Sequence, residues 1–433
     1  MTQSSALFLG VDFGTSGVRA IAIDSAGLIV SEKKIDLDAP HQHDGKHEQA
    51  PEMWWRGLIK VLALIRQDID FNRIDSLAID GTSGTLLLAD NNGQPLGPAL
   101  MYNDGRSTNE AQRISQIAPQ ESAAHGASSA LAKLLYLQAR HQARYALHQA
   151  DWIIGKLTDR WGLSDTNNSL KLGYDALSKR WPDWLTRLDI NLKCLPHVHN
   201  PGTRIGHVST TICQQFGFKS DTQVIAGTTD STAAIIATGA SRPGQAVTSL
   251  GSTLVMKVIS ETPIFSPQHG VYSQPLGDYW LVGGGSNSGG AVLRHYFSDK
   301  QMSTMTTSLQ INQPTGLDYY PLLSPGERFP ICDPNLAPRL SPRPDSDETF
   351  FQAMLEAMAR IEQRGYDLLA QLGAPYPSSV RSAGGGAKNP VWTQMREQAL
   401  GVTMLTATHQ EAAYGAALLA QRGMSSSVNL AIQ

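Results

Sequence analysis

The sequence predicts an α/β protein with two domains, and three observations support this. At 433 residues the chain is too long for one ordinary core. Apolar runs of strand length recur along it, and segments with helical spacing of apolar residues separate them. Glycine and proline punctuate residues 238–244, just before a strand-turn-strand pattern starts again. We therefore expect domains of residues 1–239 and 240–433.

The N-terminal elements are expected to be two similar hairpins joined by a helix. Residues 6–14 (ALFLGVDFG) and 19–24 (RAIAID) are apolar runs on either side of a turn-prone TSG. Residues 75–90 (DSLAIDGTSGTLLLAD) have the same form. Between them, residues 52–67 carry apolar side chains at helical intervals: Trp54, Leu58, Val61, Leu62 and Ile65. This helix can cover a sheet.

Later segments continue the α/β pattern. Residues 126–162 are expected to be mainly helical, with 131–147 (LAKLLYLQARHQARYAL) as the clearest amphipathic helix. A strand is expected within 222–240, and residues 245–259 (QAVTSLGSTLVMKVI) repeat the hairpin form. Residues 349–373 predict a long helix that Gly373 ends. Its buried stripe is expected to be Phe351, Met354, Leu355, Met358 and Ile361.

Composition favours a small-molecule enzyme of the cytoplasm. The chain has 35 basic and 38 acidic residues, a net charge of −3, so nothing indicates a nucleic-acid or membrane partner. Its three cysteines, Cys194, Cys213 and Cys332, lack the spacing of a disulfide framework or a zinc site. The N-terminus has no basic region ahead of a signal-type apolar run, and no stretch reaches the roughly 20 apolar residues of a membrane span.

Glycine-rich turns after apolar strands are the main chemical signal. Such turns expose backbone N–H groups and hydroxyls, so a phosphate can approach closely. The form occurs at Asp12–Gly17, Asp80–Thr85 and Leu250–Thr253, and a related run, VRSAGGGAKNPVW, covers 380–392. The P-loop pattern is missing, and the DFG at 12–14 has no kinase catalytic loop before it.

Two carboxylates at strand ends are candidates for chemistry. Asp12, beside the first turn, suits Mg²⁺, which takes oxygen ligands and keeps much of its water. Its alternative role is to cap the turn. Asp230 ends an apolar strand with no Lys or Arg near it in sequence, so it can accept a proton from an attacking hydroxyl. Its alternative role is to cap the helix that follows.

Taken together, these motifs resemble the FGGY family of carbohydrate kinases over nearly the whole chain. The segments that carry the likeness appear in family order: GVDFGTSGVRA, GKHEQAPEMWW, LADNNGQPLGPALMYNDGRS, DWIIGKLTD, LPHVHNPGTRIG, AGTTDSTAA, YYPLLSPGERFP, and AGGGAKNPVWTQM with EAAYGAALLA. The resemblance implies two ribonuclease H-like domains of the actin and hexokinase type around a central cleft. It also implies ATP and Mg²⁺ as cofactors, a small sugar as substrate, and a homodimer as a candidate assembly.

The resemblance also assigns roles to residues of this chain. It implies that Asp230 is the catalytic base, with Asp12 and Thr15 also in the catalytic set and with Asp12 and Asp230 as metal ligands. The turns DFGTSG and LGST look like phosphate loops, DGTSGT faces the sugar, and AGGGAKN resembles the adenosine loop. Implied cofactor contacts are Gly14, Thr15, Ser16, Gly251, Ser252, Thr253, Gly289, Gly385, Gly386, Asn389 and Trp392, the last packed behind the loop. Implied sugar contacts are Asp12, Thr82, Ser83, Asn103, Asp104 and Asp230.

One departure from the family bears on the substrate. Typical bacterial xylulokinases carry Gln-x-His-Gly where this chain has TSGT, so the small Ser83 lies in the region of their sugar-contacting histidine. In this feature and in its length the chain resembles the compact cyanobacterial and plant branch. That branch implies D-ribulose above D-xylulose. A kinase of glycerol, a hexulose or an alditol, and an actin-like ATPase without sugar transfer, stay open as alternatives.

Some charged residues are expected to be unrelated to the site. His41, His43 and His47 share one loop, without further ligands at metal spacing, and are expected to be solvated. Lys133 and Lys156 are expected to be helix-surface charges rather than phosphate ligands.

Overall fold

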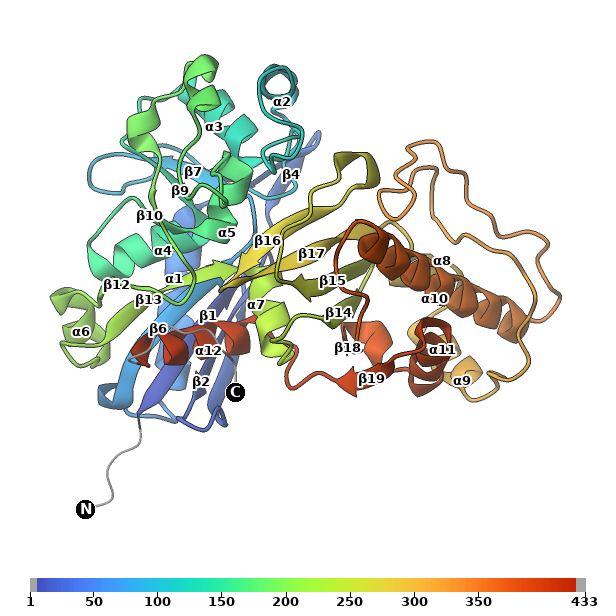
Figure 1. Cartoon of the computed structure of the whole chain (residues 1–433). Coiled ribbons are helices and arrows are strands. Elements are labelled where there is room, and N and C mark those ends of the chain that lie inside the picture. Colours follow the sequence, from blue (N-terminus) through green and yellow to red (C-terminus); the bar gives the residue numbers. More distant parts are fainter. Residues whose placement is uncertain (1–5, 426–433) are drawn as a thin grey trace. The chain divides into compact units, whose positions relative to one another are not determined.

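The computed structural model describes residues 6–425, and its contacts divide the chain into two units (Figure 1). The first unit contains the chain as far as Ala237 and again from Glu411. The second runs from Thr238 to Gln410. Each unit is a mixed α/β structure, so the predicted fold class is confirmed.

The last helix corrects the expected extent of the second domain. Helix α12 (Ala412–Met424), drawn in red in Figure 1, packs on strands of the first unit, whereas the sequence placed all of 240–433 in the second domain. Two glycines explain the fit. A Cβ on Gly10 would lie 2.0 Å from the carbonyl oxygen of Ala413, and one on Gly415 would lie 1.9 Å from that of Ala233. The helix backbone therefore touches its neighbours directly.

The main sheet of the first unit has the strand order β12-β13-β6-β1-β2-β3. Strand β1 (Leu7–Phe13) pairs with β2 (Gly17–Ile23) as the predicted hairpin, and β3 (Ile29–Asp36) extends it. Strands β6 (Ile74–Gly81) and β13 (Gln223–Thr229) lie parallel to β1, so three parallel strands form the centre of the sheet. The edge strand β12 (Arg204–His207) runs antiparallel to β13.

Helix α1 (Pro51–Ile65) confirms the predicted helix. Proline occupies its first turn, where a missing N–H costs nothing, and all five side chains of the predicted stripe are buried. The helix packs on β2 and β3 through Gly57, and it covers the face of the sheet opposite to α12 (Figure 1). The sheet therefore has a helix on both faces, as its continuous apolar strands require.

The second predicted hairpin is wrong. Strand β7 (Leu86–Ala89) does not pair with β6 but joins another sheet, with the order β4-β5-β8-β7-β9. The reason is that β1 and β13 already occupy both edges of β6. The expected helix 131–147 is also shorter, because α3 (Ala130–Gln138) ends early and residues 145–148 become strand β9 (Tyr145–His148), which pairs with β7.

In the second unit the strand order is β16-β17-β15-β14-β18-β19. The predicted hairpin of β14 (Gln245–Leu250) and β15 (Leu254–Ser260) is confirmed. Helix α10 (Asp347–Gln371) buries the whole predicted stripe, and Gly373 follows it with a φ of +105°. Strand β18 (Ser379–Ala383) runs parallel to β14 and leads through a glycine-rich turn to α11 (Pro390–Leu400).

A buried ion pair links these elements of the second unit. Arg396 on α11 donates to both carboxylate oxygens of Glu362 on α10, at 2.5 and 2.7 Å, and to the hydroxyl of Ser382 on β18. The hydroxyl of Thr248 on β14 donates to the same carboxylate at 2.6 Å. The network therefore includes one residue each of β14 and β18, the two strands that end in glycine turns.

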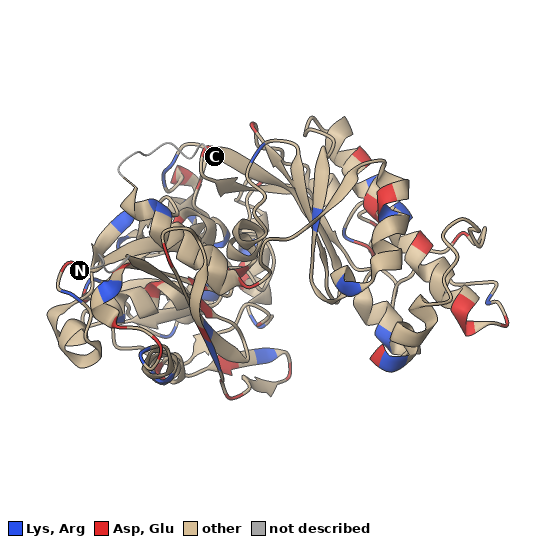
Figure 2. Ribbon diagram, turned by 90° about the horizontal axis from the view of Figure 1, so that it is seen from below, with Lys and Arg blue, Asp and Glu red and all other residues tan. Residues whose placement is uncertain are grey.

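The remaining helices and strands complete these sheets or connect them. They are β4 (His41–His43), β5 (Lys46–Gln49), β8 (Ala99–Leu100), α2 (Thr108–Ser115), α4 (Gln149–Thr158), β10 (Leu163–Asp165), α5 (Thr166–Ser169), β11 (His197–His199), α6 (Thr210–Phe216), α7 (Asp230–Ala237), β16 (Tyr272–Leu276), β17 (Tyr279–Ser286), α8 (Gly290–Tyr296), α9 (Asp299–Thr306) and β19 (Thr403–Thr406). Acidic and basic residues are interspersed through both units (Figure 2). Among the described residues, no helix combines the length and the apolar character that crossing a membrane requires.

Candidate active site

Three aspartates lie at the carboxyl ends of the three central parallel strands of the first unit. Asp12 on β1 and Asp80 on β6 are direct neighbours in the pairing of these strands. Asp230 follows β13, whose last residue, Thr229, pairs with Gly81. Ligands of open α/β sheets bind at the carboxyl ends of the strands. The sequence predicted chemical roles for Asp12 and Asp230. It gave Asp80 only as the first residue of a glycine-rich turn.

Asp80 is a buried carboxyl group to which the described residues donate no hydrogen bond. It is fully buried, and in the described part of the chain no N–H or O–H group donates to either of its oxygens. Burial, and then the charge of Asp12, raise its pKa well above the usual range. Burial also raises the pKa of Asp12. The two carboxyl groups therefore titrate as an interacting pair, in which the charge of one raises the pKa of the other.

Asp230 is the first residue of α7, and its carboxylate interacts with two backbone N–H groups. One of its oxygens accepts from the N–H of Ser231 at 2.7 Å, and the N–H of Ser83 also interacts with it. This differs from a helix N-cap, whose side chain accepts from residues two or three positions further on. Burial first, and then the charge of Asp12, raise the pKa of Asp230 to about 6. Such a pKa suits a general base near neutral pH.

The turn 82–85 is held rigidly beside these aspartates. The side-chain oxygen of Gln149, at the start of α4, accepts from the N–H of Thr82 at 3.0 Å and lies 2.8 Å from its hydroxyl. Thr85 hydrogen-bonds the same hydroxyl at 2.6 Å. The Thr82 side chain, expected to touch the sugar, therefore serves the turn itself. Ser83 is only half-buried, whereas its neighbours in the turn are buried.

Two lysines bind the carbonyl groups of the same turn. Lys133 donates to the carbonyl oxygens of Gly84 and Ser128 at 2.7 and 2.8 Å, and Lys171 donates to that of Ser83 at 3.1 Å. The expectation that Lys133 lies on the helix surface is wrong, since its side chain is fully buried. Burial, together with the charge of Lys171, lowers its pKa to about 7. Lys156 is partly exposed and lies over the ring of Trp55.

Of the other expected sugar contacts, Asp104 has a structural role. It is fully buried, and its carboxylate accepts from the N–H of His47 at 2.7 Å and from the guanidinium of Arg106. Arg106 also pairs with Glu48. Asn103 is exposed, with its amide nitrogen 3.4 Å from the ring of His47, and remains able to meet a ligand. In the Asn-Asp-x-Arg pattern, Asn103 is thus an accessible polar residue, and Asp104 is a buried residue that stabilises the local structure.

The first glycine turn of the sequence lies next to Asp12. The N–H of Gly14 donates to the carbonyl of Gly17 at 3.0 Å, and the side chain of Gln49 donates to that of Thr15 at 2.9 Å. Gly14 and Thr15 are half-buried, and Ser16 is exposed. The hydroxyls of Thr15 and Ser16 are therefore accessible to a ligand at this turn.

Three glycine turns of the second unit come together in space. The N–H groups of Gly290 and Ala291 donate to the carbonyls of Gly251 and Ser252, at 2.9 and 3.0 Å. A Cβ on Gly289, whose φ is +148°, would lie 2.7 Å from the Cα of Thr253. A Cβ on Gly384, at the third turn, would lie 2.9 Å from the carbonyl of Leu250. Only glycine permits this approach, so the predicted residues 251–253 and 289 share one surface with the start of the AGGGAKN loop.

The residues of the AGGGAKN loop differ in what they contact. A Cβ on Gly385 would meet no atom within 4 Å, so its backbone faces open space. A Cβ on Gly386 would lie 2.5 Å from the buried ring of Trp392, which therefore packs directly behind the loop. Asn389 caps α11 by accepting from the N–H of Trp392 at 2.9 Å, and its amide binds Thr306. The side chain of Asn389 is thus occupied within the protein.

The carboxylates at the strand ends suit Mg²⁺, which prefers oxygen ligands. In the residues that the structure describes, no group of three or more His, Cys, Asp and Glu side chains could hold a metal ion. Mg²⁺ commonly binds through one or two carboxylates and keeps its other positions for water and phosphate. Asp12 and Asp230 could supply these carboxylates. Of the three loop histidines expected to be solvated, His41 and His43 are exposed, whereas His47 is half-buried.

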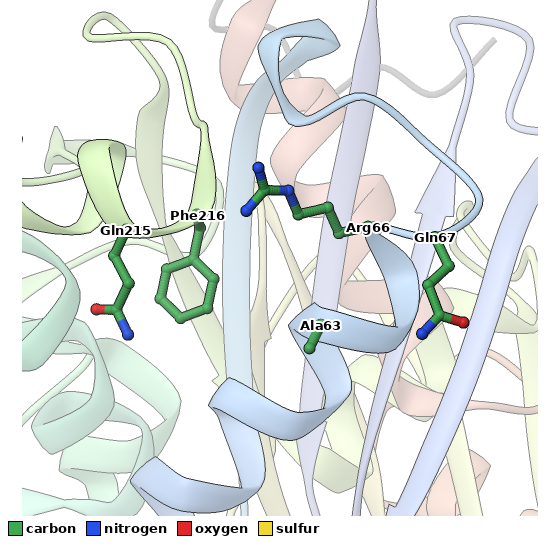
Figure 3. Close-up of a pocket in the computed structure, with 5 residues that line it drawn as sticks. All are labelled: Ala63, Arg66, Gln67, Gln215 and Phe216. Carbon is green, nitrogen blue, oxygen red and sulfur yellow. The ribbon is translucent and has the colours of Figure 1, made fainter.

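A separate hollow lies at the other end of the first unit. Ala63, Arg66 and Gln67, at the end of α1, line it together with Gln215 and Phe216 of α6 (Figure 3). The chain leaves α1 there to enter the amino end of β6, whereas Asp80 lies near the carboxyl end of that strand. This hollow therefore does not belong to the aspartate site.

Comparison with known sequence families decides the relationship. The pattern of the N-terminal domain of the FGGY family of carbohydrate kinases matches residues 7–237, and that of the C-terminal domain matches residues 246–424. The chain belongs to this family. As an FGGY kinase it is a sugar phosphotransferase, which confirms the class of enzyme that the motifs indicated.

Individual relatives of this FGGY kinase are distant but match along its length. It is 25% identical to the xylulose kinase of Escherichia coli, over 96% of this chain and 90% of the relative. It is 23% identical to the gluconokinase of Bacillus subtilis, over 89% and 81%. The crystal structure of xylulose kinase from Rhodospirillum rubrum superposes with a TM-score of 0.86 at 21% identity, over 98% and 91%. The last comparison shows the shared two-domain fold.

Proposed function

We propose that this FGGY kinase transfers the γ-phosphoryl group of ATP to a ketopentose, with D-ribulose as its best substrate and D-xylulose second. The observation that carries the proposal is Asp230, a proton acceptor beside the small Ser83 at the ends of the parallel strands. Relatives named xylulose kinase support a pentulose. The short Ser83 in the TSGT turn supports a sugar contact different from theirs.

The chemistry follows from the placement of the aspartates. A sugar hydroxyl near Ser83 would donate its proton to Asp230 as its oxygen attacks the γ-phosphorus, and ADP would leave. Asp80, whose pKa burial raises well above the usual range, would lie directly beside the Asp12 carboxylate. Mg²⁺, held by Asp12 and Asp230, would neutralise charge on the phosphates.

The glycine turns suit the nucleotide. In the first unit, the hydroxyls of Thr15 and Ser16 would bind phosphate beside Asp12. In the second, the turn Gly251–Thr253 with Gly289 offers backbone groups to phosphate, and the open backbone of Gly385 suits the adenosine. We also expect a cytoplasmic enzyme, and a homodimer remains a candidate assembly.

The substrate is tested by a coupled assay of ADP release. We expect the highest kcat/KM for D-ribulose and the second highest for D-xylulose in a panel of pentuloses, hexuloses, glycerol, alditols and gluconate. A maximum on any sugar other than these two would overturn the pentulose assignment. ATP turnover that no sugar stimulates would instead favour an actin-like ATPase.

The rate is expected to fall in acid because the base must be ionised. With a pKa of about 6, Asp230 loses its charge below that pH, so kcat/KM for the sugar should fall about tenfold per pH unit there and be level above it. Bound Mg²⁺ favours the ionised carboxylate and would move the midpoint down. Rates from pH 4.5 to 8.5 check this, and a midpoint above about 7 would contradict it.

A further inference from the structure

Lys171 is a basic residue whose backbone is held by hydrogen bonds near the proposed sugar site. It lies in the short turn Leu170–Leu172 that follows α5. Asp165 caps α5 by accepting from the N–H groups of Asn167 and Asn168, and the side chain of Asn167 donates to Thr228 at the end of β13, at 2.9 Å. The segment that carries Lys171 is therefore linked by a hydrogen bond to β13, the strand that Asp230 follows.

The side chain of Lys171 contacts the TSGT turn. Its Nζ donates to the carbonyl of Ser83, and a Cβ on Gly84 would lie 3.1 Å from its Cδ. The N–H of the same Ser83 interacts with Asp230, so one residue connects the ammonium and the carboxylate, and the charge of Lys171 lowers the pKa of Asp230. The lysine is half-buried, which leaves part of it accessible to a ligand.

An ammonium group has three N–H donors, and the protein uses few of those of Lys171. Within residues 6–425, its one hydrogen bond goes to Ser83. Lys133 differs, because it is fully buried and donates to two carbonyl groups. The turn is already held by Lys133 and Gln149, so its shape does not depend on Lys171 alone. The remaining donors of Lys171 can meet substrate oxygen atoms.

We propose that Lys171 is a specificity-determining residue that donates a hydrogen bond to the sugar oxygen on the carbon next to the phosphorylated hydroxyl. This inference rests on the proposed function, in which Asp230 accepts the proton of that hydroxyl. A donor close to Asp230 meets the neighbouring oxygen first. For a pentulose phosphorylated at C5, that oxygen is on C4, so Lys171 reads the configuration at C4.

Two pairs of sugars separate this role from others. D-Ribulose and L-xylulose differ only at C4, and D-ribulose and D-xylulose differ only at C3. We expect Lys171→Met to lower the preference for D-ribulose over L-xylulose about 10- to 100-fold, the effect of losing a hydrogen bond from a charged donor. The preference for D-ribulose over D-xylulose should change less than threefold. The measurement is kcat/KM, or the inhibition constant for an epimer that is not turned over.

Control variants make each outcome informative. Lys60→Met, an exposed lysine on α1, should change neither preference. Lys171→Arg retains a donor for Ser83 but moves its N–H groups, so it should fold and still weaken the C4 preference. Equal losses on all three sugars, in either variant, would overturn the proposal and leave Lys171 a support of the turn. A wild-type enzyme inactive on all pentuloses would refute the proposed substrate instead, and with it this inference.

Discussion

Asp230→Asn is expected to reduce sugar phosphorylation by about 10²- to 10⁴-fold while the protein still binds sugar and ATP. The amide is nearly isosteric with the carboxylate, and its oxygen can still accept from the N–H of Ser231. The fold of α7 should therefore persist. The amide cannot take the proton of the attacking hydroxyl, so the chemical step should stay slow even at Mg²⁺ concentrations that saturate the weakened site. Phosphorylation rates, measured beside calorimetric sugar affinity, check this expectation.

Asp12→Asn is the matched comparison, because it changes the neighbouring carboxylate. It should weaken Mg²⁺ and phosphate positioning, and so reduce ATP hydrolysis as well as transfer. Raising the Mg²⁺ concentration should partly restore Asp12→Asn but not Asp230→Asn. A near-normal kcat for Asp230→Asn would show that this residue only begins a helix, and the proposed mechanism would be abandoned.

Arg396→Met is expected to lower the free energy of unfolding by about 3–5 kcal/mol, because it leaves the buried Glu362 without its partner. Both side chains are essentially inaccessible to solvent. The carboxylate would keep only the hydroxyl of Thr248 as a donor among the contacts described above. Urea unfolding followed by circular dichroism measures the change. Nucleotide affinity should fall too, since Ser382 and Thr248 lie on the strands that lead into the glycine turns.

Two further variants test the physical reason. Arg339→Met removes an exposed ion pair with Asp318 and should cost no more than about 1 kcal/mol, because solvent screens such pairs. The double variant Arg396→Met/Glu362→Leu removes both buried charges and should recover much of the lost stability. If Arg396→Met cost no more than Arg339→Met, the buried pair would not hold the second unit together.

Much of the fold was predictable because local patterns agree with the final structure. Helix α1 has its apolar stripe and its N-terminal proline in the sequence, and β1 with β2 is a local hairpin. The pairing of β6 was not predictable in the same way. Its sequence resembles that of the first hairpin, but β1 and β13 compete for its edges, and these partners come from distant parts of the chain.

The candidate site shows the same division. Asp12 and Asp230 could be found because each ends an apolar strand next to a glycine or helix start. Asp80 carried the same signal, at a strand end before a TSG turn, and could have been assigned a role. Lys171 offered none, since one lysine in a short polar segment looks like a solvated charge. Lys133 was misjudged because a lysine in an amphipathic helix is expected to lie on the solvent-facing side.

By itself, the sequence determined the class of fold, the phosphate-type turns and the kinase family, because these depend on short patterns of spacing and residue type. Tertiary structure alone decided what surrounds each charge. Burial raises the pKa of Asp80 well above the usual range and that of Asp230 to about 6. Close backbone contacts at Gly10 and Gly415 also place α12 in the first unit. Such effects depend on the low dielectric and close packing that residues distant in sequence create together.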